Sequence, residues 1–238
     1  MLHHRAVKHV CFVVIIISFG IASLIYSIPI SASEDVKIFP PDSNPYGLTY
    51  GEWSAKWWQW VLSLPTDKNP LLDKTGELCN ESQEDKDVFF LVGTFGGKVE
   101  RTCTIPSGKA ILFPVVAIEA DFINTPEART EDSLMKLVKE DQDSVTLASA
   151  KVNDSELTRT NNFRFQSPLF NLSYPSNNVY GVPPGQTIAV SEGTWIMMEP
   201  LPPGEYTLNF KGVILDYSTT GPENFVTDVT YHIRIVPS

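Results

Sequence analysis

The fold class is decided by residues 226–236, VTDVTYHIRIV, near the carboxyl end of the chain. Apolar side chains at Val229, Tyr231, Ile233 and Ile235 alternate there with polar ones. A period of two places the apolar side chains on one face of a β-strand and the polar side chains on the other. The segment therefore predicts a strand that packs one face on a core and turns the other to water.

Segments of strand character recur along the chain and are separated by proline and glycine residues. They are Val88–Val92, Val99–Ile105, Ala110–Ile118, Ser144–Val152, Phe163–Phe165, Leu169–Tyr174, Thr187–Val190, Thr194–Glu199, Tyr206–Leu215 and Val226–Val236. Many short strands at this spacing are typical of sheets packed face to face. We therefore expect a mainly β protein, an antiparallel β-sandwich of jelly-roll or immunoglobulin-like type, in one domain.

A Trp-rich helix is predicted ahead of the strands. Thr49 and Glu52 have the spacing of a capping box, and Pro65 ends the segment. The apolar stripe of this helix consists of Tyr50, Trp53, Trp57, Trp60, Val61 and Leu64. We expect the stripe to cover one end or face of the sandwich, with Trp58 at its edge and partly exposed.

A second amphipathic helix is predicted to begin near Thr130, where Thr130 or Ser133 can cap it. Its apolar side is made of Leu134, Leu137, Val138 and Val145. The opposite side is acidic, so this helix is expected to lie on the surface with one face buried.

The first 33 residues, Met1–Ser33, have the organisation of a secretory signal peptide. A basic start precedes Val10–Ile30, which carries no charge, and small residues just before Glu34 predict cleavage there. The apolar run also reaches the roughly 20 residues that span a bilayer, so an uncleaved membrane anchor is the alternative. In both cases residues 34–238 form one secreted or cell-surface domain outside the cytoplasm.

The net charge of the chain argues against nucleic acids as partners. There are 18 Lys and Arg residues against 28 Asp and Glu, a net charge of −10, and no local basic patch. Such a surface repels phosphate backbones, so we expect no nucleic-acid partner. Contact with a membrane is expected only through an uncleaved leader.

Only two cysteines follow the leader, Cys79 and Cys103. An even number in an oxidising compartment predicts a disulfide between them, and two buried free thiols are the alternative. Three acceptor sequons, at Asn80, Asn153 and Asn171, make the chain a glycoprotein candidate.

Four motifs resemble a group of uncharacterised secreted proteins found in ammonia-oxidising archaea and some bacteria. They are YGLTYGEWSAKWWQW at residues 46–60, the segment 89–97 ending in GTFGG, RTCTIPSGK at 101–109 and GVPPG at 181–185. The resemblance spans residues 46–236 and implies an exported single-domain protein. It implies no activity, because none is established for the group.

Groups able to do covalent chemistry are scarce after the leader. His232 is the only histidine there, and its strand position predicts a residue that faces solvent. No nucleophile elbow, P-loop or dinucleotide fingerprint is present.

Glu119 and Asp121 follow an apolar strand and share one face, so they can share a proton, hold a hard cation or form the acid pair of a glycosidase. Acids at a strand end usually sit in water, which is the competing interpretation.

Two other groups of residues are candidate binding sites. Asp67, Asn69 and Asp73 have the spacing of oxygen ligands for calcium, although Pro70 interrupts the pattern of a helix-loop-helix calcium site. No other cofactor is predicted. An exposed Trp58 beside Gln59 would offer an aromatic face to a sugar ring or a quaternary cation.

Three functions follow from these observations. A non-enzymatic exported module that binds a glycan or a cell-envelope protein is favoured by the missing catalytic motifs and the aromatic helix. A carboxylate-dependent hydrolase that uses Glu119, Asp121 or His232 is the second. The third is a structural component of the cell envelope.

Overall fold

The computed structural model describes residues 36–153, 155–157, 160–215 and 224–238. The predicted leader, Met1–Ser33, lies outside the described residues. Residues Asp35–Ser238 form one compact unit. Within the described part of the chain, no helix has the length and apolar character to cross a membrane.

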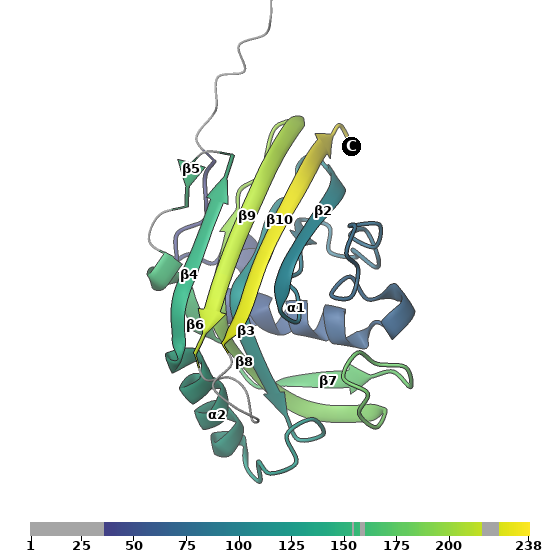
Figure 1. The fold of residues 1–238 in the computed structure, drawn as a ribbon, viewed down its shortest axis with the longest axis vertical. Coiled ribbons are helices and arrows are strands. Elements are labelled where there is room, and N and C mark those ends of the chain that lie inside the picture. Colours follow the sequence, from purple (N-terminus) through teal and green to yellow (C-terminus); the bar gives the residue numbers. More distant parts are fainter. Residues whose placement is uncertain (1–35, 154, 158–159, 216–223) are drawn as a thin grey trace, which may run out of the picture. The chain divides into compact units, whose positions relative to one another are not determined.

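Two five-stranded sheets form the domain (Figure 1), which confirms the predicted β-sandwich. The first, sheet A, has the order β1-β3-β8-β6, with β7 also paired to β8. Its strands are β1 Val88–Phe90, β3 Ala110–Asp121, β6 Arg164–Gln166, β7 Phe170–Tyr174 and β8 Gly185–Met198. The second, sheet B, has the order β2-β10-β9-β4-β5. Its strands are β2 Gly97–Pro106, β4 Val145–Val152, β5 Ser155–Glu156, β9 Gly204–Ile214 and β10 Phe225–Val236.

Most strand pairs are antiparallel, as expected, but two are parallel. The parallel pairs are β1 with β3 and β2 with β10. A parallel pair needs a long connection between its strands. The connection from β2 to β10 satisfies this rule because it contains most of the domain.

Strand β8 is a single strand, whereas two separate segments were predicted. Gly193 lies between those two predicted segments. A Cβ atom at Gly193 would come within 2.6 Å of the Ala117 Cβ, on the neighbouring strand β3. The glycine therefore permits close packing of two strands rather than ending one.

Strand β3 extends to Asp121, three residues beyond its predicted end, and contains a bulge. The register with β8 shifts between Pro114 and Val116. One inserted residue moves every later side chain to the other face. After the bulge, Glu119 lies opposite Ser191 of β8, on the face that also carries Trp195.

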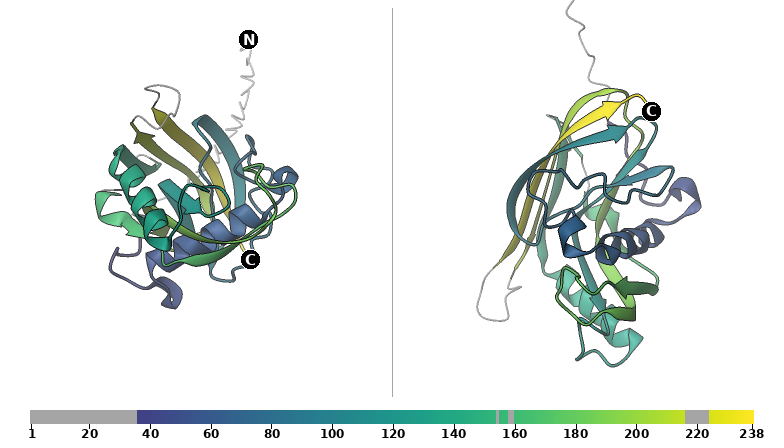
Figure 2. Two further views of the ribbon diagram at one scale, coloured as in Figure 1. Left: turned by 90° about the horizontal axis from the view of Figure 1, so that it is seen from below. Right: turned by 90° about the vertical axis from the view of Figure 1, so that its right-hand side faces the viewer.

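Helix α1, Tyr50–Ser63, covers the face of sheet A that points away from sheet B. The predicted capping box is present, with Glu52 N donating to Thr49 Oγ1 and Thr49 N donating to Glu52 Oε2. The Trp57 ring meets the Trp195 ring of β8 at 5.3 Å between centroids. Sheets A and B meet through Phe113 of β3 and Phe210 of β9, which stack at 5.1 Å. In the right-hand view of Figure 2, sheet B lies toward the left and α1 toward the right.

Helix α2, Glu131–Asp143, packs on β3 and β8. Thr130 is its N-cap, and Ser133 completes the reciprocal pair of hydrogen bonds. Val145 was predicted to extend the apolar side of this helix, but it begins β4 instead. Three short 3-10 helices complete the described elements, at Pro45–Gly47, Thr66–Lys68 and Thr160–Phe163.

Candidate ligand-binding site

A cavity of about 300 Å³ lies along the edge of strand β3. Strand β1 pairs with β3 only as far as Leu112. Beyond that point the six residues 114–119 all line the cavity, because the cavity follows the strand edge and receives side chains from both of its faces. The short β1 thus leaves room for a pocket at this edge of sheet A, lined by α1 as well as by residues of sheet B.

Aromatic rings form much of the cavity wall. They are Trp57 and Trp58 from α1, Phe95 and Tyr180 from loops, and Phe225 from β10. Phe95 and Tyr180 pack together at 5.9 Å between ring centroids. The Phe95 side chain is 46% exposed, so this pair lies toward the opening. Pockets with apolar walls and a few polar groups are the usual form of a small-molecule site.

Two polar side chains of the wall, Trp58 at Nε1 and Thr227 at Oγ1, have buried atoms without a hydrogen-bond partner in the described protein. The buried carboxyl group of Glu119 is hydrogen-bonded to the neighbouring carboxyl group of Asp121. Gln142 Oε1 and Trp195 Nε1 also lack partners, but neither residue lines the cavity. Because nearly all buried polar groups in folded proteins are paired, the two atoms of the wall point to a missing partner inside the cavity.

Glu119 lies beside a second carboxyl group, that of Asp121. Asp121 Oδ1 accepts hydrogen bonds from the backbone N–H groups of Ile123 and Asn124, at 2.7 and 3.1 Å, and Oδ2 accepts one from the Tyr174 hydroxyl at 2.8 Å. Burial, and then the charge and hydrogen bonding of Asp121, raise the pKa of Glu119 well above its usual value. The structure thus brings the two predicted acids together on one face of β3.

The competing expectation, that acids at this strand end sit in water, is wrong for this pair. Asp121 is fully buried, and the carboxyl oxygens of Glu119 are inaccessible to solvent. The reason is that β3 continues through both residues, α1 packs on the neighbouring strand β8, and Tyr174 of β7 reaches Asp121. Sequence reasoning found the pair but not its burial, which depends on a bulge and on Tyr174 from a distant strand.

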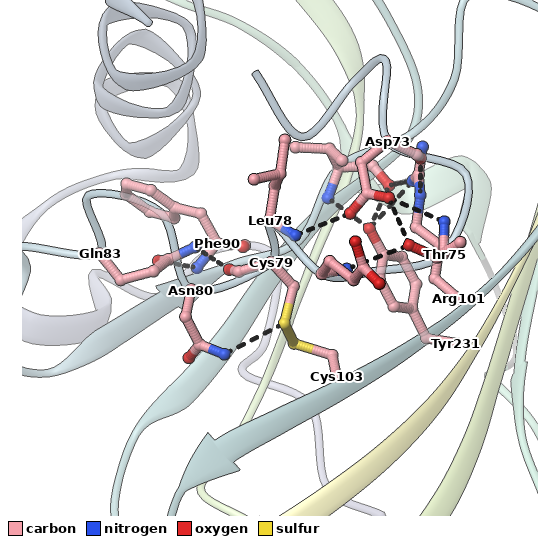
Figure 3. The surroundings of a disulfide bond; sticks show 12 residues. Asp73, Thr75, Leu78, Cys79, Asn80, Gln83, Phe90, Arg101, Cys103 and Tyr231 are labelled. Atoms are coloured by element: carbon pink, nitrogen blue, oxygen red, sulfur yellow. Dashed lines mark hydrogen bonds between the residues drawn. A yellow bond between two sulfur atoms is a disulfide. The ribbon is translucent and has the colours of Figure 1, made fainter. Parts of the chain in front are cut away.

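One wall of the cavity is held in place by buried Arg101 (Figure 3). Its Nη1 donates to the carbonyl oxygens of Val92 and Gly93, at 3.0 and 2.8 Å, and to the Tyr231 hydroxyl at 3.0 Å. Its Nε donates to the carbonyl oxygen of Asp73 at 2.7 Å. Because Gly93 begins the segment that carries Phe95, Arg101 positions the wall of the cavity without lining it.

The predicted disulfide is confirmed and lies beside this network (Figure 3). Cys79 and Cys103 are bonded, with 5.9 Å between their Cα atoms. Since Cys103 and Arg101 both belong to β2, the bond ties the 65–85 segment to the strand that carries the arginine.

Trp58 is buried, contrary to the expectation of partial exposure. Its side chain is 6% exposed, because its ring meets the Trp57 ring edge-on at 4.9 Å and turns into the cavity. Gln59 is exposed on the other side of the helix, where Nε2 donates to the Asn171 carbonyl oxygen at 2.9 Å. The structure therefore places Trp58 in the cavity wall and Gln59 outside it.

The predicted calcium ligands take part in turns. Asn69 is buried, and its side chain donates to the Val61 carbonyl and accepts from the Leu71 N–H. The Asp73 carboxylate accepts from the backbone N–H groups of Thr75 and Leu78, and this hydrogen bonding lowers the pKa of Asp73 in spite of burial. Among the described residues, no group of three His, Cys, Asp or Glu side chains is arranged to hold a metal.

His232 faces solvent on sheet B, as its strand position predicts. Its Nε2 lies 2.6 Å from Glu100 Oε1, and both side chains are about half exposed or more. The sequon residues Asn80, Asn153 and Asn171 are all exposed, which glycosylation requires, and their modification stays a prediction.

Comparisons with known proteins assign no family to this chain. No known family and no curated protein matches the sequence. Among solved structures, a chain from the structure of PbICP-C in complex with falcipain-2 matches with 12% identity and a TM-score of 0.21, over 63% of this chain and 99% of that chain. Likeness at this level carries no argument, so the site is interpreted from its own geometry.

Proposed function

We propose that this protein is an exported binding module that holds a sugar-sized polar ligand in the cavity beside β3. The observation that carries the proposal is the pair of buried, unpartnered polar atoms, Trp58 Nε1 and Thr227 Oγ1, in one aromatic wall. Aromatic faces stack on sugar rings, and the polar atoms would fix the ligand's hydroxyl groups. A cavity of about 300 Å³ is at the lower end of the range for small-molecule sites.

The compartment belongs to the same proposal. The predicted leader and the disulfide between Cys79 and Cys103 both support a protein that works outside the cytoplasm, because disulfides persist in oxidising compartments. A free sugar or an exposed unit of a cell-envelope glycan is then the ligand within reach. The resemblance to the uncharacterised secreted group agrees with this placement, since its motif at residues 46–60 contains Trp57 and Trp58.

Hydrolysis is not favoured by the arrangement of acids. A paired-acid glycosidase holds two carboxyl groups on opposite sides of the bond that is cut, roughly 5 to 10 Å apart. Of the described acids, Glu119 alone lines the cavity, and Asp121 directs its oxygens to Ile123, Asn124 and Tyr174. A binding site needs no second carboxyl group in the cavity, so this arrangement is sufficient for binding.

The test is isothermal titration of the purified protein with glucose, galactose, mannose, glucosamine and N-acetylglucosamine. Trp58→Phe keeps an aromatic ring and removes only the indole N–H, so it should weaken binding at least about tenfold, the value of one lost buried hydrogen bond. Trp195→Phe is the matched control, because Trp195 also has an unpartnered N–H but does not line the cavity. Equal loss of affinity in both folded variants, or no binding of any sugar, would overturn the proposal.

A further inference from the structure

We infer that the ligand is a 2-acetamido sugar, whose acetamide group pairs with the backbone at the free edge of strand β3, at Ala117 and Glu119. The inference rests on the proposed function and names the chemical class of its ligand. It is carried by three features of the cavity: the backbone groups at the edge of β3, the two unpartnered side-chain atoms of the wall, and the division of the wall into an aromatic and an aliphatic part.

Strand β3 has a free edge where it borders the cavity. Leu91 N still donates to the Leu112 carbonyl oxygen, at 2.9 Å, but the chain then leaves β3. The carbonyl oxygens of Val92 and Gly93 accept from Arg101 instead, at 3.0 and 2.8 Å. Beyond Leu112, none of the described strands pairs with this edge. An unpaired strand edge presents a row of backbone N–H and C=O groups.

The register with β8 shows which backbone groups point out of this edge. Glu119 lies opposite Ser191 of β8. Ser191 directs its own N–H and C=O away from β3, to the Ser167 hydroxyl at 2.9 Å and the Ser167 N–H at 2.8 Å. Facing residues of an antiparallel pair exchange either both hydrogen bonds or none, so Glu119 turns its N–H and C=O to the opposite edge, which borders the cavity. Ala117, two residues earlier, has the same orientation.

The outward backbone groups of Ala117 and Glu119 have no partner among the described residues. The next outward carbonyl oxygen along the strand, that of Asp121, accepts from Thr125 N at 2.9 Å, and no such hydrogen bond reaches the other two residues. Both are partly exposed, whereas the intervening Ile118 is buried. Since the carboxyl oxygens of Glu119 are inaccessible, its exposed part consists of main-chain and side-chain carbon atoms. Unpaired backbone groups inside a protein are rare, so these groups indicate a ligand that pairs with them.

An acetamide group matches the chemistry of this edge. Its C=O and N–H point in opposite directions, as in any trans amide, so one can pair with β3 while the other reaches a polar atom elsewhere in the wall, such as Thr227 Oγ1. Its methyl group is apolar, and so is the buried part of the wall beside the edge, which consists of Leu71, Val115, Val116, Ile118 and Ile214.

The sugar ring then belongs in the aromatic part of the cavity. Phe95 and Tyr180 lie toward the opening and offer ring faces for stacking. The buried Trp58 N–H needs an acceptor, which a ring hydroxyl provides. One molecule with a sugar ring and an acetamide group therefore serves both parts of the wall.

Other ligand classes satisfy fewer of these requirements. A sugar with hydroxyl groups alone would bury them against the aliphatic wall, and a 2-amino sugar would bury a charge there. A peptide pairs with a strand edge over several residues, whereas this edge offers two outward residues, Ala117 and Glu119, before the turn at Asp121.

The first experiment is isothermal titration at pH 7 with N-acetylglucosamine, glucosamine, glucose and N-acetylalanine N-methylamide, which has two amides and no sugar ring. N-acetylglucosamine should bind at least about tenfold more tightly than glucose or glucosamine, because it alone of the three adds an amide hydrogen bond and a buried methyl group. The variant is Ala117→Pro, which removes one outward N–H at an edge position, where proline is tolerated. In the folded variant the affinity for N-acetylglucosamine should fall at least about tenfold.

Amide hydrogen exchange, followed by NMR, tests the same edge in the unmodified protein and does not depend on the folding of a variant. In the empty protein the amides of Ala117 and Glu119 should exchange faster than those of Val116 and Ile118, which face β8. Saturation with N-acetylglucosamine should slow exchange at Ala117 or Glu119 at least about tenfold and leave Val116 and Ile118 unchanged. These two neighbours are the internal control.

The outcomes separate this inference from the proposed function. Glucose that binds as tightly as N-acetylglucosamine, or slow exchange of all four amides in the empty protein, would overturn the acetamide and leave the sugar site standing. The blocked alanine amide binding when no sugar does would overturn both and assign the edge to a peptide. No binding of any probe would also overturn both. A thermal melt of Ala117→Pro confirms that it is folded before its affinity is interpreted.

Discussion

The Tyr174 hydroxyl donates a 2.8 Å hydrogen bond to Oδ2 of Asp121, and this contact fixes the charge beside the cavity. Together with two backbone N–H groups, it holds the Asp121 carboxyl group in one orientation. Burial, and then the neighbouring Glu119 and Asp121, raise the pKa of Tyr174. Burial, and then Asp121, raise the pKa of Glu119. Asp121 is therefore the acid that the protein holds by hydrogen bonds, and Glu119 is the acid that lines the cavity.

The raised pKa of Glu119 predicts a pH-dependent cost to stability. In the unfolded chain Glu119 ionises near its ordinary pKa of about 4.3. In the folded protein it keeps its proton to higher pH. Between these two pKa values the folded state binds more protons, so the free energy of unfolding falls as pH rises.

Glu119→Gln removes this titration and should gain stability relative to the unmodified protein as pH increases. We expect the difference in free energy of unfolding between the two proteins to widen from pH 4 to pH 8, because only the unmodified protein titrates at this position. Urea unfolding at several pH values measures it. Parallel stability curves for the two proteins would show that the Glu119 pKa is not raised.

Arg101 should be essential to the fold around the cavity. Its guanidinium donates to carbonyl oxygens of two separate segments, residues 71–73 and 92–93, and to the Tyr231 hydroxyl. Arg101→Lys keeps the charge but removes the planar fork, and it leaves buried acceptors unpaired at roughly 1 to 3 kcal/mol each. We therefore expect a loss of about 3 kcal/mol in urea unfolding.

Arg234 provides a matched control for this substitution, because it is an exposed arginine on β10 of the same sheet. Arg234→Lys should change the free energy of unfolding by no more than about 0.5 kcal/mol. Similar effects at the two positions would contradict a special structural role for Arg101.

The disulfide should stabilise the domain by limiting the unfolded chain. Cys79 and Cys103 are separated by 24 positions, and a loop of this size corresponds to about 3.5 kcal/mol in the chain-entropy model. In the double variant Cys79→Ala, Cys103→Ala the free energy of unfolding should fall by about this amount. Urea unfolding of the variant, of the oxidised protein and of the reduced protein measures the loss. A loss below about 1 kcal/mol would indicate that other contacts already hold residues 65–85 on β2.

His232 offers a test of the catalytic alternative. Its Nε2 contacts Glu100 Oε1 at 2.6 Å on the exposed face of the sheet, and exposed polar contacts of this kind contribute about 0 to 1 kcal/mol. His232→Gln should therefore leave stability within that range and leave sugar affinity unchanged. A large loss of affinity in the folded variant would show that this face of sheet B takes part in binding.

The sequence predicted the individual strands and helices of the fold better than the pairing and packing between them. Period-two alternation identified β10, and a capping box identified the start of α1, because these signals are local. The sandwich partners, the two parallel pairs and the bulge after Pro114 depend on contacts between distant residues. Gly193 shows the same limit, since a packing glycine and a strand break look alike in sequence.

The candidate site was predicted in part, for a related reason. Glu119, Asp121 and Trp58 were singled out by residue type, but Trp58 was expected to face solvent. Thr227, Phe95 and Tyr180 were not singled out, because they come from segments far apart in the chain and meet only at the edge of β3. The GTFGG segment that carries Phe95 was the one local signal that pointed toward this wall.

Gly51 gives a last prediction, in which packing reverses the effect expected from helix propensity. In an open helix position, replacing Gly by Ala stabilises by up to about 1 kcal/mol. In α1, a Cβ at Gly51 would lie 2.5 Å from the Gln166 carbonyl oxygen, a backbone atom of β6 that cannot move aside as a side chain would. Overpacking of this kind costs about 1 to 3 kcal/mol, so Gly51→Ala should destabilise the domain and lower the midpoint of thermal unfolding. Ser63→Ala, at the exposed end of the same helix, should change stability by less than about 0.5 kcal/mol. If Gly51→Ala raised the midpoint instead, α1 would have to sit farther from β6, and the place of Trp57 and Trp58 in the cavity wall would need revision.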